Sequence, residues 1–151
     1  MNLFERIIEK LYLGIDGNLV YFDGLTKAKN RLYFDKVVKP KYEHERCMII
    51  FIDIDNLKTF NDLCGHETGD KRIKEVANDL MNLSGTYDVC RIGGDEFVVI
   101  ANPDFDINLL KLVAGVSHGY SIKEKTDNIS VIMKKADKLM YENKTAKKLK
   151  R

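Results

Sequence analysis

Residues 89–100 read VCRIGGDEFVVI, two apolar runs of strand length separated by four small or acidic residues. The runs Val89–Ile92 and Phe97–Ile100 are rich in β-branched and aromatic side chains, which favour strands. The intervening Gly93-Gly94-Asp95-Glu96 is typical of a tight turn. The segment therefore predicts a β-hairpin whose turn carries two carboxylates.

A second strand is predicted upstream, at Cys47–Ile52, where six apolar residues in a row give way to Asp53-Ile54-Asp55. A continuous apolar run of this length indicates a strand buried on both faces. Carboxylates at the end of such a strand lie where α/β proteins place their chemistry.

Apolar spacing and capping residues outline the other elements. We expect helices at Leu3–Leu11, from a Thr26 cap to about Val38 with Pro40 closing it, at Leu57–Cys64 before Gly65, from about Thr68 to Met81, and after Asn128. A hairpin is expected around Asp16-Gly17 and a further strand at Leu112–Tyr120.

Asp53 and the acidic hairpin turn form a candidate metal site. Carboxylates brought together repel one another unless a cation lies between them, and hard oxygen ligands suit Mg²⁺ or Mn²⁺. Gly93 and Gly94 lack a Cβ, so their backbone allows close approach of a ligand such as a phosphate, or a positive φ. The alternative is that Gly-Gly-Asp-Glu is only a good hairpin turn.

Composition restricts the class of protein. The chain has 151 residues, 44% hydrophobic and 32% charged, which suits one globular domain. No apolar run approaches the roughly 18 residues of a membrane span, and no secretory leader opens the sequence, so we expect a cytoplasmic protein. Cys47, Cys64 and Cys90 show no metal-binding spacing and are expected to be reduced core thiols.

The formal net charge of +2 hides an asymmetry, because residues 134–151 are net +6 and residues 1–133 net −4. Such a basic segment is compatible with a solvated helix face, a nucleic-acid patch or a contact with polyphosphate.

Several motifs, in order along the chain, resemble those of the GGDEF domains, the diguanylate cyclases. The hairpin reproduces the signature that names the family, and four further motifs match it in order and spacing. These are Asp23-Gly-Leu-Thr26 with Asn30-Arg31; Asp53-Ile-Asp55, Lys58, Asn61-Asp62 and Gly65-His66 to Gly69-Asp70; Ser117 with Gly119; and Ala136-Asp137, Met140-Tyr141 and Lys144.

The resemblance implies roles for individual residues. Asp53, Asp95 and the backbone carbonyl of Ile54 would hold Mg²⁺ or Mn²⁺, and Glu96 would be a second ligand or a base. Asn61 and Asp70 would recognise guanine, whose N1–H and N2 amino group both donate to a carboxylate. Contacts to the GTP phosphates would come from Gly93, Gly94, Lys58, Lys144 and Lys148.

The implied fold is a ferredoxin-like α/β sandwich, of the polymerase and nucleotide-cyclase palm type. Its central mixed or antiparallel sheet would place the hairpin beside the Cys47–Asp53 strand. Residues 1–22 would form an N-terminal helix and hairpin extension, and residues 23–151 the GGDEF domain. The implied reaction joins two GTP molecules into cyclic di-GMP with release of pyrophosphate, in a homodimer with one GTP in each domain.

Three departures from the family pattern affect these expectations. Ser84 and Tyr87 stand where an RxxD product-inhibition site would end, so feedback at that site should be absent. Lys147-Lys148 replaces a Gly-Arg pair, and lysine lacks the planar fork of arginine. Residues 101–111 leave room for a turn or two where the family has a full helix, so we expect the N-terminal helix or a second subunit to cover apolar strand side chains there.

Alternative functions remain open on the sequence alone. They are a catalytically inactive GTP-binding or regulatory module, a minimal cyclic-dinucleotide synthase with another base preference, and a nucleic-acid-binding domain that uses the basic C-terminal segment. Asp70 argues for guanine. No stacking surface or recognition-helix pattern supports nucleic-acid binding, and we expect no nucleic-acid or membrane partner.

Overall fold

The computed structural model describes residues 2–3 and 20–150. The expected helix at Leu3–Leu11, the hairpin around Asp16-Gly17 and most of the proposed extension at 1–22 lie outside these residues. Within them, a four-stranded antiparallel sheet has the order β2-β3-β1-β4. The strands are β1 (Cys47–Ile54), β2 (Thr86–Arg91), β3 (Glu96–Ala101) and β4 (Val116–Lys123). This is the strand order of a ferredoxin-like sandwich, as the sequence predicts.

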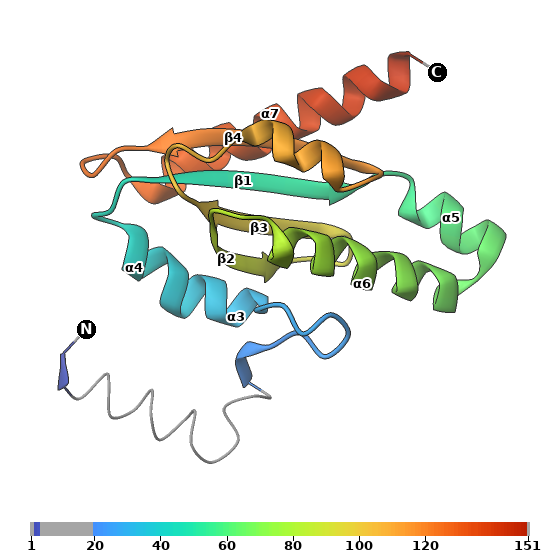
Figure 1. Ribbon diagram of the computed structural model, residues 1–151, viewed down its shortest axis with the longest axis horizontal. Helices are drawn as coiled ribbons and strands as arrows, with labels where there is room; N and C mark the ends of the chain where they lie inside the picture. The colour runs from blue at the N-terminus through green and yellow to red at the C-terminus, as the bar shows by residue number, and fades with distance from the viewer. Residues whose placement is uncertain (1, 4–19, 151) are drawn as a thin grey trace.

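Helices cover both faces of the sheet (Figure 1). One face carries α6 (His66–Asn82) and the short 3-10 helix η2 (Ile107–Leu112), with α5 (Leu57–Cys64) at the end of β1. The other carries α7 (Ile129–Leu149) and the segment made of α3 (Arg31–Tyr33), the π-helix η1 (Phe34–Val38) and α4 (Lys39–Tyr42). Each face therefore has its own apolar core.

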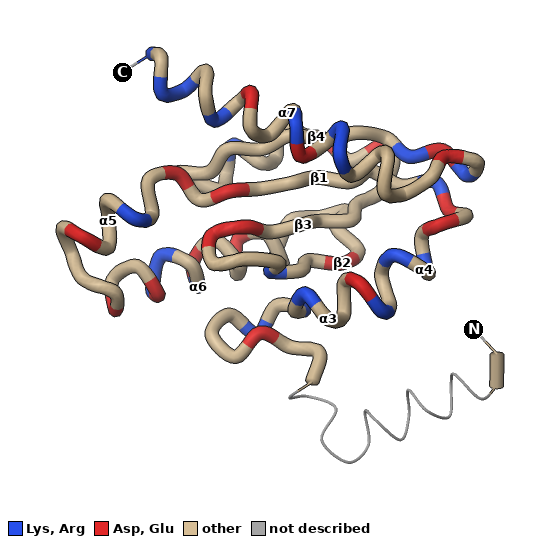
Figure 2. Tube along the Cα trace, turned by 180° about the vertical axis from the view of Figure 1, so that it is seen from behind, with Lys and Arg blue, Asp and Glu red and all other residues tan. Residues whose placement is uncertain are grey.

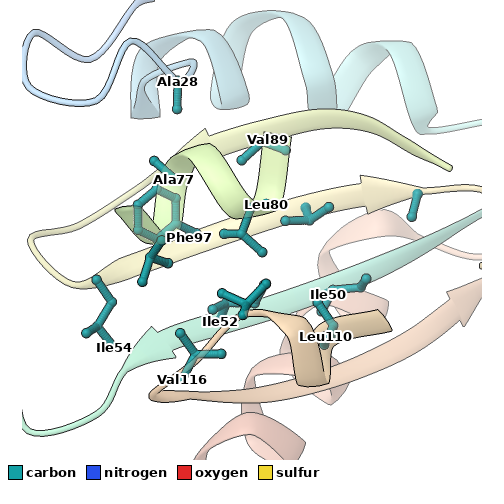
Figure 3. Packing of buried hydrophobic residues seen from close by; sticks show 14 of the residues in the cluster. Ala28, Ile50, Ile52, Ile54, Ala77, Leu80, Val89, Phe97, Leu110 and Val116 are labelled. Atoms are coloured by element: carbon teal, nitrogen blue, oxygen red, sulfur yellow. The ribbon is translucent and has the colours of Figure 1, made fainter. Parts of the chain in front are cut away.

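The central strand β1 supplies both cores, because successive side chains of a strand point to opposite faces. Ile50, Ile52 and Ile54 pack with Phe97 and Leu80 under α6 (Figure 3), whereas Ile49 and Phe51 pack under α7. All eight residues of β1 are buried. The prediction of a strand buried on both faces is confirmed, and the strand continues to Ile54.

The first described helical segment begins later than predicted. Asn30, not Thr26, is the N-cap, since its side chain accepts from the N–H of Tyr33 at 2.9 Å. The Thr26 hydroxyl instead bonds Asp23 in a turn at 2.8 Å. Nor does Pro40 close the helix. It lies in the first turn of α4, where a missing N–H is tolerated, directly after the wider π-helical turn.

The stretch after β3 forms only the turn or two predicted for it, and the expected cover by the N-terminal helix lies outside the described residues. Phe105, Leu110 and Val113, from and around η2, are buried against the face that carries α6. One short helix and the residues around it therefore cover part of this face. Tyr120 and Ile122 of β4 remain 39% exposed beside it. Strand β4 is shifted toward the C-terminus relative to the predicted Leu112–Tyr120, because Leu112 belongs to η2.

Two cysteines confirm the prediction of core thiols and one does not. All three are free; Cys47 and Cys90 are buried, but Cys64 is exposed at the end of α5. None of the helices in the described ranges combines the length and apolar composition that a membrane crossing requires.

Lys123 is a buried lysine at the end of β4 that contacts the segment between α4 and β1. Its ammonium donates to the carbonyls of Glu43 at 2.6 Å, Glu124 at 3.0 Å and Glu45 at 3.3 Å, and the residue is fully buried.

Replacing Lys123 by methionine would leave three carbonyls without their donor, so we expect unfolding in urea to show that the free energy of unfolding falls by about 2–4 kcal/mol. The exposed Lys125→Met is the matched control. Equal stability of the two variants would show that water replaces the ammonium without cost.

Candidate active site

The acidic hairpin turn lies beside the end of β1, as the sequence predicts. Strand β3 pairs with β1 so that Glu96 stands directly opposite Asp53. The backbone N–H of Ile54 donates to the carbonyl of Asp95 at 2.9 Å. The turn and the end of β1 are therefore fixed to each other, and Figure 2 shows their acidic segments side by side.

Asp53 points to the α7 face, because it continues the alternation of Ile49 and Phe51 along β1. It meets Lys144 there, whose ammonium lies 2.5 Å from Asp53 Oδ1. The side chains of Asp53 and Lys144 are only 8% and 23% exposed. The ion pair spans 91 residues of sequence and joins α7 to the acidic edge.

The surroundings of this acidic edge disfavour the ionised form of Asp53 and Glu96. Burial, together with the charges of Asp95 and Asp55, raises the pKa of Asp53 despite the bond to Lys144. Burial and the charges of Asp95 and Asp53 likewise raise the pKa of Glu96. Burial lowers the pKa of Lys144, but its bond to Asp53 and the surrounding acids outweigh this and raise it. One ammonium thus compensates these carboxylates only in part.

This donor set fits a hard divalent cation in its chemistry. Asp53, Asp95, Glu96 and the Ile54 carbonyl offer only oxygen atoms, and burial together with neighbouring carboxylates raises the pKa of Asp53 and of Glu96. In the described part of the chain, no three His, Cys, Asp or Glu side chains are already grouped as a cation site. The residues thus suit Mg²⁺ or Mn²⁺, but their side chains would have to converge further to hold it.

The two turn glycines matter because they lack a Cβ, and not because their backbone adopts an unusual conformation. Neither has a positive φ, which excludes one of the two roles expected for them. A Cβ on Gly93 would lie 2.7 Å from Glu96 Oε2, and a Cβ on Gly94 would meet nothing within 4 Å. Gly93 makes room for Glu96, while Gly94 leaves the backbone of the turn open to an approaching ligand.

Arg91 holds the turn in place, a role that the sequence did not suggest. Its guanidinium donates to the Gly94 carbonyl at 2.8 Å and to both carboxylate oxygens of Asp23, at 3.1 and 3.2 Å. Asp23 is itself fixed by the N–H and hydroxyl of Thr26, each at 2.8 Å. The Asp23–Thr26 motif is therefore a support for the hairpin.

Asp55 also has a supporting role. It accepts from the Ser117 hydroxyl at 2.5 Å and from the Lys147 ammonium at 3.1 Å, and Lys147 also contacts the Val116 carbonyl. These bonds fix the turn after β1 to β4 and α7. Asn56 adopts a left-handed conformation, φ 57°, and reverses the chain into α5. Asp55, Ser117 and Lys147 are site residues that sequence reasoning did not single out, although two of them belong to the matched motifs.

Helices α5 and α6 bring Asn61 and Asp70 to neighbouring positions. Asn61 lies over Gly69, since a Cβ there would be 1.6 Å from its Oδ1. Asp70, the next residue, is exposed, and Asn61 Oδ1 is buried without a hydrogen-bond partner. A buried acceptor without a donor requires an explanation, and a ligand that donates there is one.

The remaining predicted phosphate contacts are cationic and accessible. Lys58 is exposed on α5, one turn before Asn61, and Lys148 is exposed on α7, one turn after Lys144. A small hollow at this end of α7 is lined by Asp55, Asn56, Lys144, Lys147 and Lys148. Three lysines therefore surround a space next to the acidic edge.

Comparison with known proteins identifies the family of this chain. Residues 20–106 match the family model described as "Diguanylate cyclase, GGDEF domain". The chain is 34% identical over 98 residues to the probable diguanylate cyclase DgcE of Escherichia coli K12, covering 61% of this chain and 9% of DgcE. It is 34% identical over 122 residues to the bifunctional diguanylate cyclase/cyclic di-GMP phosphodiesterase MucR of Pseudomonas aeruginosa, covering 74% of this chain and 18% of MucR.

Solved structures show the same fold. The GGDEF domain of DgcB from Caulobacter crescentus, in complex with c-di-GMP, superposes with a TM-score of 0.73 at 25% identity, covering 84% of this chain and 91% of that one. The form of DgcB with its coiled coil gives 0.77 at 24% identity, covering 95% and 89%. The chain spans only a small part of its longer relatives, but its matched part exceeds half of its own length. The chain therefore belongs to the GGDEF domain family.

Proposed function

We propose that this domain is a diguanylate cyclase that condenses two molecules of GTP into cyclic di-GMP and two of pyrophosphate. The observation that carries the proposal is the acidic edge: Asp53 pairs with Lys144, Glu96 stands opposite Asp53 in the next strand beside Asp95, and two further lysines lie nearby. Such an edge suits a bound metal and a triphosphate together. The family relationship and the names of its relatives support the same reaction.

In the proposed mechanism, Lys144 and Lys148 bind the triphosphate of one GTP, and the open backbone at Gly94 lets it approach the hairpin. Lys58 adds a third cation on α5. Asp53, Asp95 and the Ile54 carbonyl would hold Mg²⁺ or Mn²⁺, which when bound lowers the pKa of an attacking hydroxyl and stabilises leaving pyrophosphate. Glu96 is placed to assist as a further ligand or as a base.

The base is selected between α5 and α6. Asp70 accepts from the N1–H and N2 amino group of guanine, a donor pair that adenine lacks. Asn61 lies next to it with a buried oxygen free to accept. GTP is therefore the proposed substrate, and not ATP.

Each domain supplies one half of the reaction in this proposal. The 3′-hydroxyl of the GTP in one domain attacks the α-phosphate of the GTP in a second copy, and the reciprocal attack closes the ring. Turnover per molecule should therefore rise with protein concentration, because a homodimer is the active form.

The test is incubation of the purified protein with GTP, ATP or both, with Mg²⁺ or Mn²⁺, followed by chromatographic identification of products. We expect cyclic di-GMP from GTP alone and none from Asp95→Ala. Binding of GTP without product at any protein concentration would make the domain a nucleotide-binding module. An adenine-containing product would contradict the role given to Asp70.

A further inference from the structure

Two lysines of α7 each pair with a carboxylate at the end of β1, but the two pairs differ in their surroundings. Lys144 lies on Asp53 at 2.5 Å, and Lys147 lies on Asp55 at 3.1 Å. The first carboxylate is one that the proposed function assigns to a metal ion. The second is one that the structure uses as a support.

The Lys147–Asp55 pair is anchored on both sides. Asp55 accepts from the Ser117 hydroxyl with its other oxygen, and Lys147 also donates to the Val116 carbonyl. Breaking this pair would leave partners on β4 unsatisfied. We therefore expect Lys147 to remain on Asp55 throughout the reaction.

The Lys144–Asp53 pair has no such anchor. Among the described residues, Asp53 is the hydrogen-bond partner of the Lys144 ammonium, and no backbone carbonyl holds it in addition. The lysine side chain is long and flexible, and it borders the hollow that Lys147 and Lys148 also line. A polyphosphate bound over this end of α7 would offer Lys144 a more strongly charged partner than a single carboxylate.

Lys144 and a dication would compete for Asp53. The Lys144 ammonium lies 2.5 Å from Asp53 Oδ1, close to where a metal ion bound to that oxygen would lie. Its positive charge also repels a second cation. The pair is mostly buried, so solvent screens this repulsion weakly.

We propose that Lys144 is a built-in counter-cation of Asp53, which keeps the metal affinity of the free protein low until nucleotide phosphates draw it away. This inference rests on the proposed function, since it concerns the same metal and phosphate groups. Its consequence is that the domain binds metal and nucleotide together and binds little metal alone. Removing Lys144 should therefore weaken nucleotide binding but strengthen binding of the bare metal.

The experiment is titration of the nucleotide-free protein with Mn²⁺, with free Mn²⁺ measured by electron paramagnetic resonance. Lys144→Met is expected to bind Mn²⁺ about tenfold more tightly than wild type, because a positive charge beside the ligand is lost. Lys148→Met is the matched control. It removes the same charge one helical turn after Lys144, and Lys148 has no carboxylate partner among the described residues. We expect its Mn²⁺ affinity to stay within about twofold of wild type, because its charge is exposed and screened.

A double-mutant cycle assigns the effect to Asp53. In the Asp53→Asn background, Lys144→Met should no longer tighten Mn²⁺ binding, because the shared carboxylate is gone. Lys144→Gln is a second variant in case the methionine variant does not fold, as judged by its unfolding transition.

The outcomes separate this inference from the proposed function. Equal or weaker Mn²⁺ binding by Lys144→Met would overturn the counter-cation role, while cyclic di-GMP synthesis by the wild type would still support the cyclase. A gain that persists in the Asp53→Asn background would also overturn it. Absence of Mn²⁺ binding in every nucleotide-free variant would overturn the inference, while the metal of the proposed mechanism would then enter only with the nucleotide.

Discussion

Asp53→Asn is expected to lower cyclic di-GMP synthesis by about a thousandfold or more, and to leave the folded domain at least as stable as wild type at neutral pH. Asparagine has the shape of aspartate but lacks the charge that would bind a metal. The same charge is costly to the fold, because Asp53 is buried, opposite Glu96 and close to Asp95.

The expected gain in stability follows from the direction of the pKa shift. A carboxyl group whose pKa is raised on folding stabilises the folded state at low pH, where it is protonated, and this contribution is lost as the pH rises through the folded pKa. At neutral pH the wild type therefore keeps a carboxylate that the fold disfavours. Asparagine, which does not ionise, removes that cost.

Product formation and thermal unfolding, measured on the same preparation at neutral pH, test both parts. Asp88→Asn is the control, because Asp88 is also a buried acid but accepts from Tyr42 at 2.8 Å, away from the acidic edge. It should lose stability and keep its activity per folded molecule. An Asp53→Asn variant that makes cyclic di-GMP at the wild-type rate would refute the role of Asp53.

Gly119→Ala is expected to produce the largest loss of stability among glycine-to-alanine substitutions at the described residues. Gly119 lies on β4 under α7, and a Cβ there would be 2.0 Å from the Met140 nitrogen and 2.4 Å from the Ala136 oxygen. These are backbone atoms of a helix, which cannot rotate aside. We expect a loss of about 3 kcal/mol or more, and a fall in Tm of about 6 °C or more.

The same substitution should impair the site at a distance. Displacement of α7 would move Lys144 from Asp53 and break the bond that the His118 N–H donates to Asn143 Oδ1 at 3.1 Å. The affinity for GTP should fall even in the folded fraction, as isothermal titration below the transition would show. Gly24→Ala is the control, since a Cβ there meets nothing within 4 Å. Similar stability of the two variants would show that α7 moves away from β4 without cost.

The parts of the fold that sequence could predict are those with a strong local signal. Strand β1 follows from six consecutive apolar residues, α5 from its spacing and the stop at Gly65, and the start of α7 from Asn128, whose side chain caps the helix. The GGDEF motif predicted both a hairpin and its place beside β1. Asp53 and the acidic turn were candidate metal ligands from their own chemistry, and the resemblance then gave each residue a role.

Elements with competing local signals were not predictable. Thr26 and Asn30 are both good helix caps, and only the bond of Thr26 to Asp23 decides between them. The sequence LVAGVSHGY permits a strand on either side of Gly115. In the structure Gly115 has a φ of 64° and separates η2 from β4. The supporting bonds of Arg91, Lys147 and Lys123 join residues far apart in the chain, so no local pattern reveals them.

The ion pair between Lys144 and Asp53 also has a consequence for how the domain is made. Its partners are separated by 91 residues, and α7 must pack on a sheet whose central strand was synthesised long before. During translation, β1 and the hairpin leave the ribosome with their α7-facing side chains uncovered and their carboxylates without a lysine. A nascent chain therefore holds the acidic edge before it holds Lys144 and Lys148, so the nucleotide binding proposed for the domain would be complete only when the last turns of α7 emerge.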